Sequence, residues 1–250
     1  MLREERMAGL AKGLSILEAF GTAGQKLTIS DVARATDLSR ATAKRCLSTL
    51  TELGYARFDG KFYSPAPRVL RLGAIYAASV DLPQLATPYL DTLRDTVDES
   101  TSLAVLLQNE TFFIARSEGR HLISSGVRVG ASTPLHVSAT GQVLLAGMSE
   151  EHLVSYLESA NLTQRTKYTV GSVEELTQKL AQIRIDGYAI CIEEMEIGLS
   201  SIASPVRDAN GEVVAAMSVS TSTVRTPAEA MKERFAPALR RQSELLGRQL

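Results

Sequence analysis

The sequence has 250 residues, of which 44% are hydrophobic, and it contains two cysteines. A chain of this length can bury a substantial core in one domain or in two. Its first residues lack the apolar stretch of a signal peptide and no run of about 18 apolar residues follows, so we expect neither a leader nor a membrane span. Cys46 and Cys191 lie far apart and show no metal-ligand spacing. A cytoplasmic protein without a metal or cofactor is therefore predicted.

The charge is divided unevenly along the chain, although the formal net charge is only -1. Residues 1–80 carry 12 Lys and Arg against 7 Asp and Glu, a balance of +5, whereas residues 81–250 carry 15 against 21, a balance of -6. A basic block of this kind favours a polyanionic partner at one end of the molecule. Ordinary variation of surface charge is the alternative explanation.

The first part of the chain has the pattern of three helices. Apolar residues at three- and four-residue steps predict a helix over residues 7–20. Thr28 is placed to cap a short helix over residues 29–35, because an acidic residue follows three positions later. Ser39 is placed to cap a third helix over residues 40–53. Two helices joined by so short a turn indicate a helix-turn-helix.

A wing and a linker follow the third helix. Two short strands, residues 55–58 and 61–64, flank Asp59 and Gly60, a dipeptide that suits a type I′ hairpin turn. Apolar residues then continue over 69–76 as a helix that joins two domains. The predicted organisation is a winged helix-turn-helix domain over 1–65, a linker helix over 66–80, and an effector-binding and oligomerisation domain over 81–250.

The remaining chain mixes helices and strands, which indicates an α+β domain whose sheet is covered by helices. Helices are predicted over residues 85–97, 139–146, 150–159, 173–186 and from 227 to the end of the chain. Strands are predicted over residues 103–107, 111–116, 188–193, 201–207 and 213–221.

The start of the third helix carries the features of a DNA-reading element. In a helix-turn-helix the N-terminal residues of the second helix enter the major groove, where Arg or Lys can reach guanine and Thr can meet a thymine methyl group. Arg40 and Arg45 are predicted to make the leading base contacts, while Arg57 and Lys61 in the wing contact the flanking backbone or minor groove. A solvated basic face on a three-helix domain is the alternative. The predicted DNA-contacting residues are Thr28, Ser39, Arg40, Ala41, Thr42, Lys44, Arg45, Arg57 and Lys61.

These residues resemble the IclR-type bacterial transcriptional regulators, and the resemblance spans nearly the whole chain. In the first domain it is carried by GLAKGLSIL at 9–17, LTISDVA at 27–33 and LSRATAKR at 38–45. In the second it is carried by TPLHVSATGQ at 133–142, DGYA at 186–189, Glu193 and Glu194 with Gly198, IASPV at 202–206 and AAMSVS at 215–220. The opening run, the SRATA helix start and LTQRT at 162–166 are most similar to the subgroup that controls breakdown of protocatechuate and 4-hydroxybenzoate.

The resemblance implies a GAF-like effector-binding domain, a homodimer or tetramer, and palindromic double-stranded promoter DNA as a partner. RNA polymerase is a possible further partner, and no membrane partner is expected. It also places a ligand against the loop and helix start after His136. Small residues there let amides at a helix N-terminus approach an anionic group, so a small carboxylic acid is expected. The implied effector-binding residues are His136, Ser138, Ala139, Thr140, Gly141, Cys191, Ser201, Ser218 and Ser220.

Two positions depart from the family pattern. Many relatives carry an acidic residue in place of Cys191 and commonly a cysteine in place of Ser201, so we expect a larger, flatter or more apolar acid, such as an aromatic one. Arg116 or Arg128 could supply a counter-charge, and either could equally be a surface residue. His136 either fixes the loop or contacts the ligand, and Cys191 is either a ligand contact or a plain buried strand residue.

The predicted function is a DNA-binding transcriptional regulator that responds to a small organic acid, aromatic or dicarboxylic, and controls aromatic-acid catabolism. A regulator of another carboxylate pathway is the nearest alternative, and a DNA-binding protein without a ligand is a second. An enzyme is not expected, because the sequence lacks the nucleophile elbow, the phosphate-binding loop, the dinucleotide-binding fingerprint and the H-E-x-x-H zinc motif.

Overall fold

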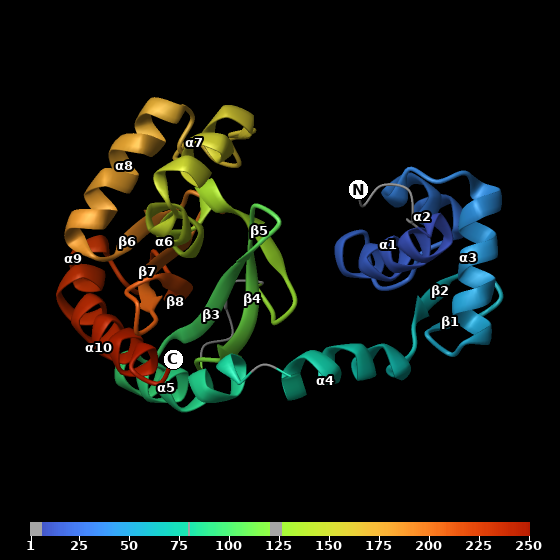
Figure 1. The fold of residues 1–250 in the computed structure, drawn as a ribbon, viewed down its shortest axis with the longest axis horizontal. Coiled ribbons are helices and arrows are strands. Elements are labelled where there is room, and N and C mark those ends of the chain that lie inside the picture. Colours follow the sequence, from blue (N-terminus) through green and yellow to red (C-terminus); the bar gives the residue numbers. More distant parts are fainter. Residues whose placement is uncertain (1–6, 80, 121–126) are drawn as a thin grey trace. The chain divides into compact units, whose positions relative to one another are not determined.

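The computed structural model describes residues 7–79, 81–120 and 127–250. The chain divides into two compact units, Met1–Val80, here called the head, and Asp81–Leu250, called the body (Figure 1). Within the described ranges, no helix is long and apolar enough to cross a membrane.

The head is built on three helices, α1 (Ala8–Thr22), α2 (Ile29–Thr36) and α3 (Arg40–Glu52). Both predicted caps are present. Thr28 forms a capping box with Asp31 at the start of α2, and the Ser39 side chain accepts a hydrogen bond from the Thr42 amide at the start of α3. A shared apolar core holds the three helices together; it includes Ile16, Phe20, Val32, Ala43 and Leu47.

The wing consists of β1 (Ala56–Phe58) and β2 (Tyr63–Pro65), paired antiparallel. Its turn is not the predicted type I′ turn, which needs positive φ at both central residues. Gly60 has φ +101°, but neither Asp59 nor Lys61 has a positive φ. The Asp59 carboxylate accepts hydrogen bonds from the Lys61 and Phe62 amides, at 3.0 and 2.8 Å. Asp59 therefore begins the turn, and the central pair lies one residue later than predicted.

The predicted linker helix is present as η1 (Pro67–Val69) and α4 (Leu70–Ser79). Its start is fastened to the end of α3. The Arg68 Nη1 donates a hydrogen bond to the Leu53 carbonyl at 2.7 Å, and the Arg68 guanidinium lies 5.1 Å from the centre of the Tyr55 ring, within the range of a cation–π contact.

The body contains one six-stranded sheet in which every neighbouring pair is antiparallel. The strand order is β5-β4-β3-β8-β7-β6 (Figure 1). The strands are β3 (Ser100–Leu107), β4 (Glu110–Ser117), β5 (Ser132–Pro134), β6 (Ala189–Ile192), β7 (Leu199–Arg207) and β8 (Val213–Ser222).

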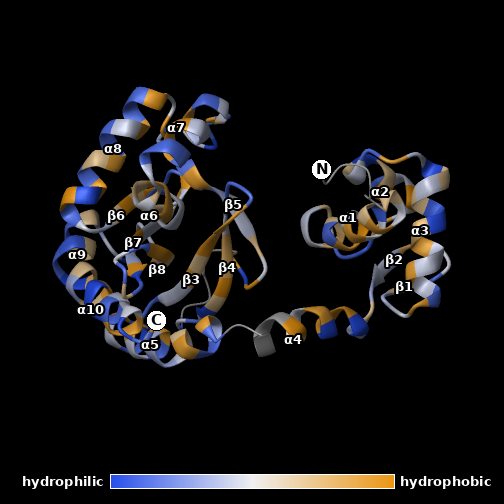
Figure 2. Cartoon of the chain, in the orientation of Figure 1, coloured by the Kyte–Doolittle hydropathy of each residue, from blue (hydrophilic) through white to orange (hydrophobic). Residues whose placement is uncertain are grey.

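Helices cover both faces of this sheet. Because successive side chains of a strand point to opposite faces, Ile202 and Met217 pack into the core of α5 and α10, whereas Ala203 and Ala216 pack into the core of α6, α7 and α8. Figure 2 shows the hydrophobic residues concentrated on the strands and on the inner sides of the helices. The helices are α5 (Leu82–Val97), α6 (Ala139–Gly147), α7 (Glu150–Ser159), α8 (Val173–Asp186) and α10 (Ala236–Gly247), with a 3-10 turn η2 (Leu135–Val137) before α6.

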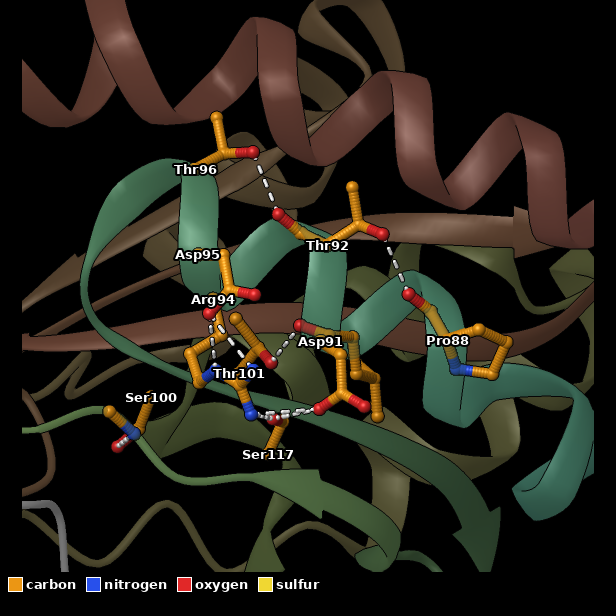
Figure 3. Close-up of polar contacts among 11 residues, drawn as sticks. Pro88, Asp91, Thr92, Arg94, Asp95, Thr96, Ser100, Thr101 and Ser117 are labelled. Carbon is orange, nitrogen blue, oxygen red and sulfur yellow. Dashed lines mark hydrogen bonds and ion pairs between the residues drawn. The ribbon is translucent and has the colours of Figure 1, made fainter.

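Polar contacts also tie α5 to the sheet (Figure 3). The Arg94 Nη1 donates hydrogen bonds to the Asp91 carboxylate at 2.9 Å and to the Ser117 hydroxyl at 2.6 Å. Ser117 in turn donates to Asp91, and the Thr101 hydroxyl donates to the Leu90 carbonyl at 2.9 Å. These bonds connect the helix to β3 and β4.

The sequence predicted one continuous helix from residue 227 to the end of the chain, but the structure divides this region into three segments. It begins as a short turn, α9 (Ala228–Ala230), passes through a π-helical segment, η3 (Met231–Phe235), and continues as α10. Pro237 lies in the first turn of α10 and has no amide hydrogen. Because Pro237 cannot donate a backbone hydrogen bond to the preceding turn, the regular α-helical pattern is interrupted at the start of α10.

Candidate DNA-binding and effector-binding sites

The exposed side of α3 carries most of the predicted DNA-contacting residues. Arg40, Ala41, Lys44 and Arg45 are exposed, whereas Thr42 is half-buried. Among the described residues, no acidic side chain forms an ion pair with Arg40, Lys44 or Arg45. Arg40 and Lys44 are four residues apart and so lie on one face of the helix.

Ser48, which was not among the predicted DNA contacts, continues this face. It is exposed and lies one turn after Lys44. The four-residue step was the available signal, but a serine carries no charge and was overlooked. Arg45 lies beside the face and also lines an apolar groove between α1 and α3.

The two capping residues of the predicted set are already hydrogen-bonded. The Thr28 hydroxyl donates to the Asp31 carboxylate at 2.7 Å, and this bond is the main reason that the pKa of Asp31 is lowered. A negative charge therefore stands at the start of α2, where a phosphate would otherwise be attracted. At the start of α3, the Ser39 hydroxyl donates to the Thr42 hydroxyl at 3.0 Å, and no acid lies in the first turn.

The wing adds exposed positive charge. Arg57 is exposed on β1, and Lys61 is exposed in the turn, with its Nζ 5.0 Å from the centre of the Phe62 ring. Asp59 offsets part of this charge, but its carboxylate lies 3.8 Å from the Lys26 Nζ. The head thus presents cations on both α3 and the wing.

A small cavity in the body lies against the sheet face that carries α6. Its volume is about 30 Å³, which leaves room for about one or two water molecules. Six of the nine predicted effector residues line it: Ser138, Thr140, Cys191, Ser201, Ser218 and Ser220. The remaining lining residues were not predicted; they are Phe113, Val127, Val137, Glu194, Met195 and Leu199.

The strand register explains why these residues meet. Cys191 lies opposite Ser201, and Ser201 lies opposite Ser220, so β6, β7 and β8 contribute one polar row. Ser218 lies opposite Ala203 in the next row of the same face. Directly opposed residues of antiparallel strands point to the same side of a sheet. Hydroxyl and thiol groups therefore form the floor of the cavity.

Three predicted effector residues, His136, Ala139 and Gly141, are not among the residues that line the cavity. The His136 Nε2 is 3.1 Å from the Thr163 carbonyl, and the ring is buried. Ala139 is fully buried in the core of α6 and α8. A Cβ atom on Gly141 would lie 2.2 Å from the Leu135 carbonyl oxygen, so this glycine packs directly against the backbone. These contacts favour the interpretation in which His136 fixes the loop.

The charges at the cavity are largely balanced. Glu194 is buried, and its carboxylate pairs with Lys179 and accepts a hydrogen bond from the Gln142 Nε2 at 2.9 Å. Burial raises the pKa of the Cys191 thiol well above its ordinary value, so this side chain stays uncharged at neutral pH. The cavity therefore offers an anionic ligand hydroxyl groups and a neutral thiol beside an acid that is already paired.

The two candidate counter-charges differ sharply in position. Arg128 is exposed, whereas the Arg116 side chain on β4 is only 4% exposed. In the described part of the chain, no group of three or more His, Cys, Asp or Glu residues is arranged to hold a metal ion.

The whole chain is similar to known bacterial regulators. Residues 9–60 match the IclR helix-turn-helix domain and residues 74–247 match the bacterial transcriptional regulator IclR C-terminal domain. The Pca regulon regulatory protein of Pseudomonas putida is 40% identical over 98% of this chain and 84% of that protein. The p-hydroxybenzoate hydroxylase transcriptional activator of Acinetobacter baylyi is 34% identical over 95% and 89%, respectively.

Solved structures agree with this assignment. An IclR homologue from Microbacterium hydrocarbonoxydans, crystallised with 4-hydroxybenzoate, is 28% identical, covers 96% of this chain and 98% of its own, and has a TM-score of 0.81. The relatives are regulators and not enzymes, and the predicted α+β class with a winged helix-turn-helix is confirmed. The chain belongs to the IclR family of bacterial transcriptional regulators.

Proposed function

We propose that a hydroxybenzoate-class aromatic acid binds in the cavity of the body, changes the affinity of the head for promoter DNA, and so controls genes of aromatic-acid breakdown. The observation that carries this proposal is the polar row Cys191–Ser201–Ser220 on the cavity floor, in a chain 40% identical to a Pca regulon regulatory protein. The 4-hydroxybenzoate complex of a structural relative supports the ligand class.

The cavity chemistry suits such a ligand. Phe113, Met195 and Leu199 provide apolar contacts for an aromatic ring, and the serine hydroxyls provide hydrogen bonds that add no charge. A cavity of about 30 Å³ is too small for a benzoate ring, so the acid enters a rearranged cavity. Met195 is suited to this change, because an unbranched methionine side chain adapts its shape readily.

On the DNA side, the head reads promoter sequence through the start of α3. Arg40, Lys44 and Arg45 make base contacts in the major groove, and Ala41 and Thr42 lie close to thymine methyl groups. Of the remaining predicted residues, Ser39, Arg57 and Lys61 position the protein on phosphates, whereas Thr28, whose hydroxyl is bonded to the Asp31 carboxylate, caps α2. Exposed cations on α3, which have no acidic partner within the described ranges, and an exposed basic wing support these roles.

The head also supports a homodimer. Leu10 and Leu14 on α1 are 61% and 47% exposed, and Leu53 at the end of α3 is 49% exposed. They line one apolar groove, and Figure 2 shows the hydrophobic character of α1. A second copy of the chain covers this groove, because exposed contiguous apolar surface favours association. Two paired recognition helices then contact two half-sites of a palindromic promoter in the cytoplasm.

Two assays test the proposal. Footprinting on the DNA upstream of the protein's own gene is expected to protect two half-sites about one or more helical turns apart. A thermal-shift panel with 4-hydroxybenzoate, protocatechuate and a β-keto dicarboxylate is expected to give the largest shift with an aromatic acid, since a ligand at 100 times its Kd stabilises by about 2.7 kcal/mol. A thermal shift with the dicarboxylate alone would assign the protein to another carboxylate pathway. Protection of the DNA without a thermal shift from any acid would refute the proposal that an aromatic acid is the effector.

A further inference from the structure

Arg116 is a buried cation that keeps unused hydrogen-bond donors. Its side chain is 4% exposed, and its Nη1 donates to the Ser102 hydroxyl at 3.0 Å. Among the residues that the structure describes, its Nε and Nη2 have no hydrogen-bond partner. The nearest acid, Glu118, lies 3.8 Å from the Nε and is 74% exposed, so it neutralises the guanidinium only weakly. Burial of an incompletely paired charge disfavours the folded state.

The position of Arg116 connects it to the cavity. Arg116 lies opposite Ser102 in the β3–β4 pair, and Ser102 lies opposite Ser218 in the β3–β8 pair. The three side chains therefore form one row on one face of the sheet. Ser218 lines the cavity, as does Phe113 from the same strand as Arg116. β4 and β8 are two strand spacings apart, about 9.6 Å, and Ser102 on β3 lies between Arg116 and Ser218 in this row.

The unused donors have the geometry of an anion site. Nε and Nη2 lie on the same edge of the guanidinium group, and this edge can hold both oxygens of a carboxylate in parallel hydrogen bonds. Ser102 occupies the other terminal nitrogen, Nη1, and holds the group in place. Arg128, the other candidate counter-charge, is exposed and does not line the cavity.

We infer that Arg116 binds the carboxylate of the effector through its Nε and Nη2, with Ser102 and Ser218 beside it, when the cavity widens across β3 toward β4. This inference rests on the proposed function, because it assigns one end of the acid within that cavity. The ring then lies toward Phe113 and the polar row of β6, β7 and β8. Arg116 thereby selects acids over neutral compounds of the same shape.

Calorimetric titration of the full chain tests this assignment with two probes, 4-hydroxybenzoate and its neutral analogue 4-hydroxybenzamide. The wild type is expected to prefer the acid, and Arg116→Gln is expected to weaken acid binding about 10- to 100-fold while changing amide binding little. Arg128→Gln is the matched control and is expected to bind as the wild type does. Equal acid affinity in Arg116→Gln and wild type would overturn the inference, as would an equal loss for acid and amide.

A measurement without ligand separates binding from support of the fold. Because Arg116 is incompletely paired, Arg116→Met is expected to unfold at the same temperature as the wild type or higher, as replacing buried charges by apolar groups often does. A marked fall in the unfolding temperature, or failure to fold, would assign Arg116 a structural role and refute the inference. Failure of the wild type to bind either probe would instead remove the proposed function itself.

Discussion

Gly141 is the residue at which the α6 helix touches the backbone before it. The Cβ of an alanine there would lie 2.2 Å from the Leu135 carbonyl oxygen, and backbone cannot move aside as a flexible side chain can. Gly141→Ala is therefore expected to destabilise the chain by about 1–3 kcal/mol, the usual cost of overpacking. Chemical denaturation measures the change. Gly21→Ala, with open space at its Cβ, is the control and should not destabilise; equal losses would contradict the close approach.

Lys179 and Glu194 form the paired charge at the cavity wall. Lys179→Met would leave the buried Glu194 carboxylate with the uncharged partners Gln142 and Cys191, so we expect a loss of about 3 kcal/mol of stability. Adding Glu194→Gln removes the stranded charge and should restore most of this loss. Urea denaturation of the two single variants and the double variant checks the coupling. Additive losses would show that the pair does not interact.

Arg40 and Lys61 are expected to contribute differently to DNA binding. Arg40→Ala should cost about 1–3 kcal/mol on the promoter site and relax base preference. Lys61→Ala should weaken binding to all sequences alike and reduce the salt slope by about 1. Arg40 is the better probe than Arg45, because Arg45 also lines the apolar groove. Salt titrations on specific and random duplexes distinguish the two, and identical behaviour would contradict the division of roles.

The site could be predicted in part from residue types and family resemblance. Ser201, Ser218 and Ser220 were expected from the family resemblance, and all three line the cavity. The sequence could not decide between Arg116 and Arg128 as the counter-charge for the ligand, because the burial of a side chain and the state of its hydrogen-bond donors depend on the folded structure. Ser102 and Glu194 were missed because their importance depends on which strands become neighbours, and the order β3-β8-β7-β6 brings together segments distant in sequence.

At the scale of elements, α1 carries an apolar face that the head's own core does not cover. Leu10→Glu is expected to convert a dimer into a monomer and to weaken promoter binding, because a charge would be buried in the contact. Sedimentation velocity measures the mass. Val224→Glu is the control, since Val224 is 92% exposed on the body, and it should leave the assembly unchanged. A Leu10→Glu variant of unchanged mass would show that α1 is not the dimer contact.

Most elements could be predicted because local signals agreed with the fold. The Thr28 capping box and the Ser39 cap placed the starts of α2 and α3. Local signals failed where side chains compete with the backbone or where tertiary pairing decides. The Asp59 carboxylate moved the wing turn by one residue, and β3 begins at Ser100 because its polar first residues pair with β8.

At the scale of the whole molecule, the head and the body have different properties that suit DNA binding and ligand binding, respectively. The head carries the positive charge that suits DNA, and the body carries the cavity and a net negative charge. An acid bound in the body can alter DNA binding only if it binds one conformation of the protein more tightly than another. The coupling expected for such a device is about 1–3 kcal/mol.

The most direct measurement is fluorescence-anisotropy titration of the promoter DNA beside the protein's own gene, at fixed salt, with and without saturating 4-hydroxybenzoate or protocatechuate. A coupling of about 1–3 kcal/mol predicts a change of about 5- to 150-fold in the Kd for this DNA with one of the acids. A duplex of random sequence should show no such change. An acid that binds in calorimetry yet leaves the promoter Kd unchanged would contradict the proposal that this cavity controls the head.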